Sequence, residues 1–142
     1  MGTTTVTATA TDKSGNSATA TFTVTVTYSV KSLFDETKPH TSGSTIPLAL
    51  QVTAADRTNL SSASLSVTAV GIAPASTNTP PSPAPSPGNA YPGGRFKYDP
   101  TVGGTGWYTF NLKTTGPKPG TYKLFCTIGD DLTLHFVEFV VR

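Results

Sequence analysis

The apolar and polar positions alternate most clearly at the end of the chain. In residues 120–128 every second position is apolar or aromatic, which is the two-residue period of a β-strand. Gly129, Asp130 and Asp131 follow with turn-forming residues, and residues 132–141 are again rich in β-branched and aromatic side chains. This pattern predicts a β-hairpin in which one face carries Tyr122, Leu124, Cys126, Ile128, His135, Val137, Phe139 and Val141.

A second hairpin is expected at the start of the chain. Residues 3–11 and 18–27 alternate threonine with apolar residues, and residues 12–17 between them form a cluster of turn formers. One face of this hairpin is polar and the other apolar, and the larger apolar side chains on it are Val6, Phe22, Val24 and Val26.

The middle of the chain adds further short strands. We expect an edge strand near Val30, a strand over 44–52, another around Leu65 to Ala69, a short one over 95–100 and one over 107–113. The inward positions are Ile46, Leu48, Leu50, Val52, Tyr108, Phe110 and Leu112. Residues 71–94 are rich in proline and serine with few apolar anchors, so we expect a long exposed loop without regular structure. The chain is therefore predicted to be all-β.

The N-terminal hairpin resembles the last two strands of the hyalin-repeat (HYR) type of immunoglobulin-like domain. The resemblance rests on a Thr/Val strand, an Asp-x-x-Gly-Asn turn and a strand that ends Phe-x-Val-x-Val, formed here by Asp12, Gly15, Asn16, Phe22, Val24 and Val26. It covers only two strands, whereas a complete sandwich needs several more. It implies that residues 1–27 are the C-terminal hairpin of a preceding repeat.

The order of motifs after residue 28 resembles the bacterial PxKF-type immunoglobulin-like domain. The motifs lie at 43–48, 107–114, 119–124 and 132–142, and Ala49 and Leu50 replace the Lys and Phe of the family's naming motif. The resemblance implies an immunoglobulin-like antiparallel β-sandwich over residues 28–142. It also implies a non-catalytic spacer or adhesion module of a secreted or surface multi-domain bacterial protein, located outside the cell.

Composition narrows the possible functions further. Charged residues make up 13% of the chain and the net charge of +2 is scattered, so we expect no nucleic-acid partner and no membrane partner. The start at Met1 lacks the regions of a signal peptide, which indicates a start inside a longer protein. The lone Cys126 cannot form an intrachain disulfide, and its place within a strand predicts a buried, inert thiol.

Catalytic chemistry has little support in the sequence. His135 lies within a strand and His40 in an expected loop, and neither accompanies a nucleophile or carboxylate motif. Asp12, Asn16, Asp130 and Asp131 are better explained as turn formers than as calcium ligands. Glu138 could assist an isopeptide bond, but no lysine is placed against it by the sequence. We therefore expect no enzyme activity, no metal and no cofactor.

Two surfaces are candidates for binding. If Trp107, Tyr91 and Tyr98 were exposed and coplanar, they would form an aromatic platform, and the protein would be an accessory carbohydrate-binding module of an extracellular hydrolase. The outer face of the final hairpin carries Phe125, Leu134, Phe136 and Val140, and the N-terminal hairpin has an apolar face of its own. We expect these two faces to be buried together, either within one chain or by exchange in a homodimer. The other expected partners are neighbouring immunoglobulin-like domains of the parent protein and a surface protein or glycan ligand.

Overall fold

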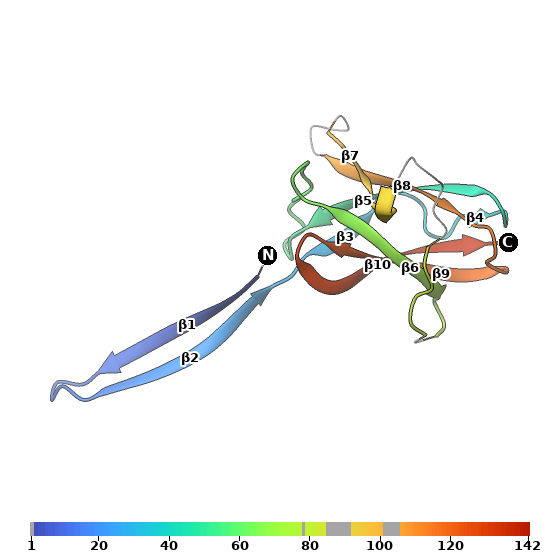
Figure 1. Ribbon diagram of the computed structural model, residues 1–142. Coiled ribbons are helices and arrows are strands. Elements are labelled where there is room, and N and C mark those ends of the chain that lie inside the picture. Colours follow the sequence, from blue (N-terminus) through green and yellow to red (C-terminus); the bar gives the residue numbers. More distant parts are fainter. Residues whose placement is uncertain (1, 78, 85–91, 101–105) are drawn as a thin grey trace.

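The computed structural model describes residues 2–77, 79–84, 92–100 and 106–142. It is all-β, as predicted, apart from one short 3₁₀ turn (Figure 1). The strands are β1 (Gly2–Thr11), β2 (Ser17–Val26), β3 (Ser29–Ser32), β4 (Pro39–His40), β5 (Thr45–Thr53), β6 (Val67–Pro74), β7 (Lys97–Asp99), β8 (Trp107–Lys113), β9 (Gly120–Ile128) and β10 (Asp131–Val141), with the 3₁₀ turn η1 at Pro92–Gly94.

Two four-stranded sheets pack face to face and form a β-sandwich. One has the strand order β4-β10-β9-β6 and the other β3-β5-β8-β7. The strand pairs are antiparallel except for the parallel pair β4–β10. The core between the sheets holds the side chains expected from alternation, including Ile46, Leu48, Leu50, Val52, Tyr108, Phe110, Leu112, Leu124, Cys126, Ile128, Val137, Phe139 and Val141. The alternating positions of these strands were therefore assigned to the correct faces.

The N-terminal hairpin is a separate two-stranded sheet of β1 and β2. It projects from one end of the sandwich, and the C-terminus lies at the opposite end (Figure 1). Its register pairs Val6 with Phe22 and Thr7 with Thr21, so apolar residues and threonines lie on opposite faces as predicted, except for Thr4, which pairs with Val24 on the apolar face. The turn is closed by Asp12, whose carboxylate accepts the backbone N–H groups of Ser14 (2.8 Å) and Asn16 (2.9 Å).

Pro47 lies at a position of β5 where its missing backbone N–H removes no hydrogen bond from the sheet. It lies near the start of β5 and pairs with Asn111 of β8. The other neighbour of β5, strand β3, pairs only with Leu50 to Thr53. Pro47 therefore has no strand on its second side and blocks no ladder hydrogen bond, as expected for proline at a strand entry or a local edge.

The proline-rich segment differs in part from its prediction. Residues 71–74 belong to β6, and Ser82 forms an isolated bridge to Ile72 with N–H···O distances of 2.7 and 2.9 Å. The expectation of a wholly irregular loop over 71–94 was wrong here because β6 is an edge strand, and its free backbone groups find partners in the returning chain. A methyl group on Gly71 would overlap the Ser82 carbonyl, so this approach requires glycine. Residues 78 and 85–91 of the segment lie outside the described residues.

Candidate functional surfaces

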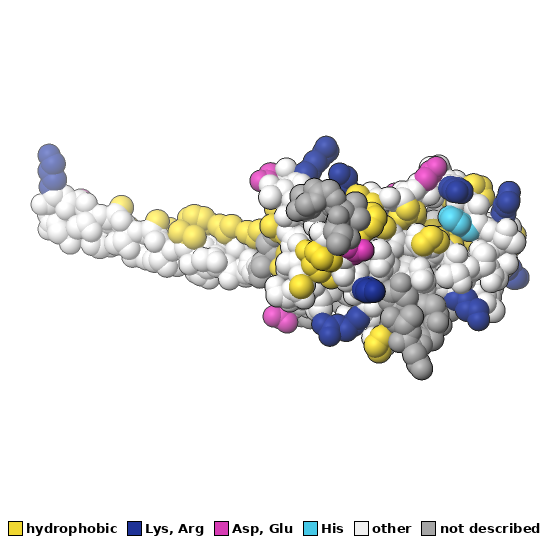
Figure 2. Space-filling view, turned by 90° about the horizontal axis from the view of Figure 1, so that it is seen from above, with side chains coloured by type: hydrophobic (Ala, Val, Ile, Leu, Met, Phe, Trp, Pro, Cys, Tyr) yellow, Lys and Arg dark blue, Asp and Glu magenta, His cyan; other side chains and the backbone are white. Residues whose placement is uncertain are grey.

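The two faces of the β1–β2 hairpin have opposite character. One face is a double row of Thr and Ser, with hydroxyl contacts across the strands such as Thr11 to Ser17 at 2.8 Å. On the other face Val6, Phe22, Val24 and Val26 are 37%, 56%, 42% and 48% exposed. These four residues, the hairpin face, belong to an apolar strip that runs along the projecting ribbon toward the sandwich (Figure 2).

A second apolar surface lies on the outer face of β9 and β10. Phe125 and Phe136 pair directly across these strands, with ring centroids 5.8 Å apart. Leu134 and Phe136 are exposed, whereas Phe125 and Val140 are half-buried. The Lys123 ammonium lies 4.5 Å from the centroid of the Phe136 ring and 4.0 Å from the Glu138 carboxylate. We call Phe125, Leu134 and Phe136 the sheet patch; Val140 lies further along β10 beside Pro39 of β4.

Bulges shape this surface in a way that the sequence did not reveal. The β6–β9 register shifts between Ala69 and Gly71, and the exposed Val70 lies at that shift. The β10–β9 register shifts between Asp131 and His135, the stretch that contains Leu134. Bulges re-aim side chains, and each of these shifts accompanies an exposed aliphatic residue on the β6-β9-β10 sheet.

The hairpin face and the sheet patch do not cover one another within the chain. The hairpin approaches the sandwich at its root, where Gly2, Thr3 and Thr25–Thr27 share a hollow with Asp130, Asp131 and Thr133. Both apolar surfaces stay exposed in the single chain. The expected burial of one against the other is therefore a hypothesis about two chains.

The root of the hairpin is tied to the sandwich by Asp131. The Asp131 carboxylate accepts the Tyr28 N–H at 3.4 Å and lies 3.3 Å from His135 Nε2. It also accepts the Thr133 N–H at 2.9 Å. The Thr133 donors are the main reason that the pKa of Asp131 falls to about 2, with smaller contributions from His135 and the Tyr28 N–H. Asp131 is the first residue of β10, and its carboxylate thus holds the short linker after β2 against the start of that strand.

Two of the three aromatic residues expected to form a ligand platform, Trp107 and Tyr98, lie on opposite faces of their sheet. Tyr98 pairs with Tyr108 across β7 and β8 and packs on its ring at 5.5 Å, against the core. Trp107 neighbours Tyr108 on β8, so its half-buried side chain points to the opposite face, and its indole Nε1 is buried. Tyr91 lies outside the described residues. The dispersal of Trp107 and Tyr98 over two faces removes the main support for an aromatic sugar platform.

The remaining candidates for chemistry have structural surroundings. Cys126 is 1% exposed, and burial raises the pKa of its thiol to about 12, so the expectation of a buried thiol is confirmed. His40 is not in a loop: it lies in β4, and its carbonyl accepts the Arg142 N–H at 2.8 Å. Among the described residues no group of three or more His, Cys, Asp or Glu side chains is placed to hold a metal ion.

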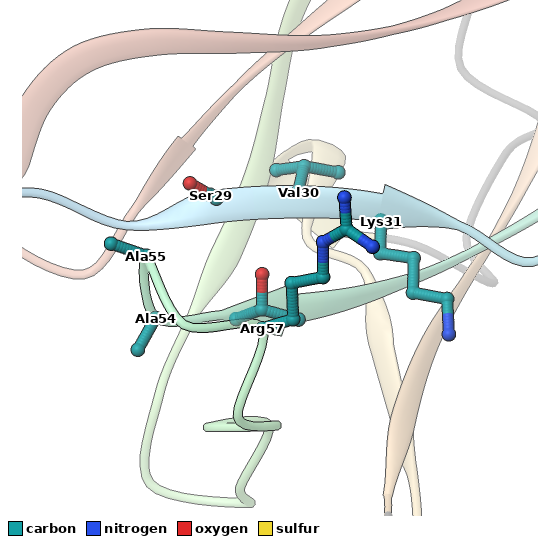
Figure 3. A pocket seen from close by; sticks show the side chains of 7 residues that line it. Ser29, Val30, Lys31, Ala54, Ala55 and Arg57 are labelled. Atoms are coloured by element: carbon teal, nitrogen blue, oxygen red, sulfur yellow. The ribbon is translucent and has the colours of Figure 1, made fainter.

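A small basic hollow was missed by the sequence analysis. It lies beside β3 and the turn after β5, has a volume of about 380 Å³, and is lined by Ser29, Lys31 and Arg57 among others (Figure 3). Lys31 and Arg57 are far apart in a sequence whose charges are otherwise scattered. Alternation in β3 placed Lys31 outward, but only the pairing of β3 with β5 brings the two cations to one site.

Comparison with known proteins bears on the hairpin alone. The HYR domain model matches residues 1–26, which are the β1–β2 hairpin, and the match does not extend into the sandwich. No curated protein matches the chain. HYR domains are non-catalytic, immunoglobulin-like modules of extracellular proteins, and the hairpin is the part of this chain that is similar to them. Within the described residues no helix has the length and apolar character to cross a bilayer.

Proposed function

We propose that the chain is a non-catalytic spacer module of a secreted or surface multi-domain protein. In this proposal an HYR-type domain ends with the β1–β2 hairpin, and the sandwich over residues 28–142 follows it directly as the next immunoglobulin-like domain. The match at residues 1–26 supports the first half of the proposal. The resemblance of residues 28–142 to bacterial PxKF-type domains supports the second half.

The observation that carries the proposal is the position of the two ends of the sandwich. The chain enters at Tyr28, whose N–H contacts Asp131 at the start of β10, and it leaves after Val141 at the other end of the same strand. A strand of 11 residues spans about 36 Å at ~3.3 Å per residue. Entry and exit at opposite ends let successive domains follow one another in a line, as a spacer requires.

The linker is short, and its sandwich end is tied to β10. Only Thr27 and Tyr28 separate β2 from β3, and the Tyr28 N–H is held by the Asp131 carboxylate. Glu36 adds a second tie between β3 and β10, because its carboxylate accepts both the Ser32 hydroxyl at 2.6 Å and the Glu138 N–H at 2.9 Å. A short linker with fixed backbone groups restricts the angle between neighbouring modules.

Small-angle X-ray scattering of the monomer tests this geometry. The hairpin adds about 33 Å to the sandwich at ~3.3 Å per residue, so we expect a maximum dimension of about 70 Å. Asp131→Ala should broaden the distance distribution, and Asp130→Ala, the neighbouring turn acid, should not. A maximum dimension no larger than that of the sandwich alone, as expected if the hairpin folds back on it, would contradict the spacer proposal.

A further inference from the structure

The basic hollow joins two surface cations that the fold brings together from different elements. Val30 packs against the core, so its neighbours Ser29 and Lys31 point to the outer side of β3. Arg57 comes from the turn after β5, and its side chain extends toward β3 beside Lys31 (Figure 3). Thr53, Ala54 and Ala55 complete the lining.

Neither cation is neutralised by an acid. The hollow has no carboxylate in its lining, and the ion pairs Lys123–Glu138 and His135–Asp131 of the described residues involve neither Lys31 nor Arg57. Asp56 is next to Arg57 in sequence, but it does not line the hollow, and its carboxylate accepts the Thr58 N–H at 2.9 Å. Two like charges that share a hollow without a counter-charge raise the local potential for an anion.

The backbone at Arg57 is unusual. Its φ of 69° makes it the one non-glycine residue with positive φ among those described. The turn is closed by Arg57 N–H to Ala54 O at 3.0 Å and Ala54 N–H to Thr58 O at 2.9 Å. Glycine or asparagine is favoured at such a position, so arginine lowers the stability of the turn. The strain does not itself show binding, but it fixes the direction from which the guanidinium leaves the turn.

We propose that this hollow binds the carboxylate groups of an acidic polysaccharide. The planar Arg57 guanidinium presents paired N–H donors that match a carboxylate, and Lys31 adds a second point charge. No aromatic side chain lines the hollow, so neutral sugars lack a stacking surface and the charged group is the part recognised.

A polysaccharide fits this position better than an acidic peptide. Strand β3 has a free edge, but the backbone groups of Ser29 and Lys31 point into the β3–β5 ladder, so the hollow itself offers side chains and no free N–H or C=O row for a peptide strand. A sugar acid needs only side-chain contacts. Each exposed charge pair is weak, and a polymer with repeated carboxylates gains affinity from many such modules. This binding goes beyond the spacer role and does not depend on it.

The test is an amide NMR titration of the whole chain with short oligogalacturonate at low salt. We expect shifts confined to residues 29–31 and 53–58, weakening as salt is added. The fully methyl-esterified oligosaccharide, which has the same ring without the charge, should cause no shifts. Absence of shifts with the acid, or equal shifts with the ester, would overturn the proposal.

Two variants assign the site. Lys31→Gln removes one charge, and Arg57→Gly removes the other while giving the turn the residue that its φ favours, so the fold is preserved. Each should weaken binding about 2- to 5-fold, and the double variant about tenfold or more. Lys113→Gln, an exposed cation at the opposite end of β5, is the control. Unchanged binding in the double variant, or binding of polyglutamate equal to that of oligogalacturonate, would refute the assignment.

Discussion

Removing one hydroxyl from the core should reveal how the loop after β5 is held. Tyr108 is 1% exposed, and its Oη accepts the Ser62 N–H at 3.1 Å. The same hydroxyl donates toward the carbonyls of Ser62 and Leu65, at 2.9 and 3.0 Å. Tyr108→Phe keeps the ring and its packing but leaves a partly buried N–H and two carbonyls without this partner.

The expected loss in the free energy of unfolding follows from these contacts. A hydrogen bond contributes about 1 kcal/mol net, and an unsatisfied buried group costs about 1–3 kcal/mol. We therefore expect Tyr108→Phe to lower the free energy of unfolding by about 1.5–3 kcal/mol. At ~4 °C per kcal/mol for a chain of this size, Tm should fall by about 6–12 °C. Urea denaturation followed by far-UV circular dichroism measures the first quantity, and calorimetry the second.

A second tyrosine provides a matched control. Tyr122 also donates its hydroxyl to a carbonyl, that of Lys118 at 2.9 Å, but this bond is exposed. Tyr122→Phe should therefore cost less than about 0.5–1 kcal/mol, because water replaces the lost partner. If both variants lose the same stability, or if Tyr108→Phe loses less than about 0.5 kcal/mol, the loop does not depend on the buried hydroxyl.

The same tyrosine gives a pH signature. Burial, followed by smaller effects of Tyr98 and Tyr28, raises the pKa of Tyr108 above its usual value of 10.0. The unfolded chain then loses this proton first as the pH rises, so stability is complete below about pH 10 and falls above it. We expect Tyr108→Phe to lose less stability than the wild type between neutral pH and pH 11.

Three further outcomes are expected. Cys126 should react with a thiol reagent at pH 8 only as fast as the sandwich opens, because burial raises its pKa to about 12; labelling within seconds would contradict this. Gly71→Ala should displace the Ser82 bridge, cost about 1–3 kcal/mol and expose residues 75–84 to protease, whereas Val70→Ala should not; equal proteolysis would contradict this. Asp131, whose pKa is lowered to about 2 mainly by the Thr133 donors, stabilises the fold above pH 3.8 and ceases to do so as the pH falls toward 2; Asp131→Ala should flatten acid unfolding over that window, and an unchanged profile would argue against the hydrogen bonds that this carboxylate accepts from Thr133.

The sequence predicted the faces of the strands well because a strand has a period of two. Tyr108, Phe110 and Leu112 could be assigned to the core without any knowledge of their partners, and the structure buries all three. The same reasoning separated the threonine face of the hairpin from its apolar face. Local patterns of this kind need no tertiary information.

The parts that the sequence did not predict depend on contacts between distant segments. Ser82 pairs with β6 only because that strand lies at a sheet edge, and no local signal identifies an edge. The approach of Arg57 to Lys31 likewise requires the β3–β5 pairing. Asp131 was recognised as a turn former. Its contact with the Tyr28 N–H could not be predicted, because the two residues are 103 positions apart in the sequence.

The hairpin raises the question of what covers its apolar face. A two-stranded ribbon is marginally stable by itself. In the proposed parent protein, the other strands of the HYR-type domain cover this face. In the isolated chain the face measures about 33 by 10 Å from strand length and spacing, so stacking two such faces buries only about 700 Å². This is below the ~1,200 Å² of a stable interface, whereas reciprocal exchange, with each hairpin face on the partner's sheet patch, doubles it.

We therefore expect concentration-dependent dimers of this chain, formed by exchange. Phe22→Ser on the hairpin face and Phe136→Ser on the sheet patch should each weaken the dimer, because each removes one side of the same contact. Thr5→Ala, on the threonine face of the hairpin, should leave it unchanged. Light scattering after size exclusion measures the mass across a dilution series. A dimer weakened by Phe22→Ser alone would indicate stacking between hairpins, and a monomer at every concentration would show that the two apolar surfaces do not meet.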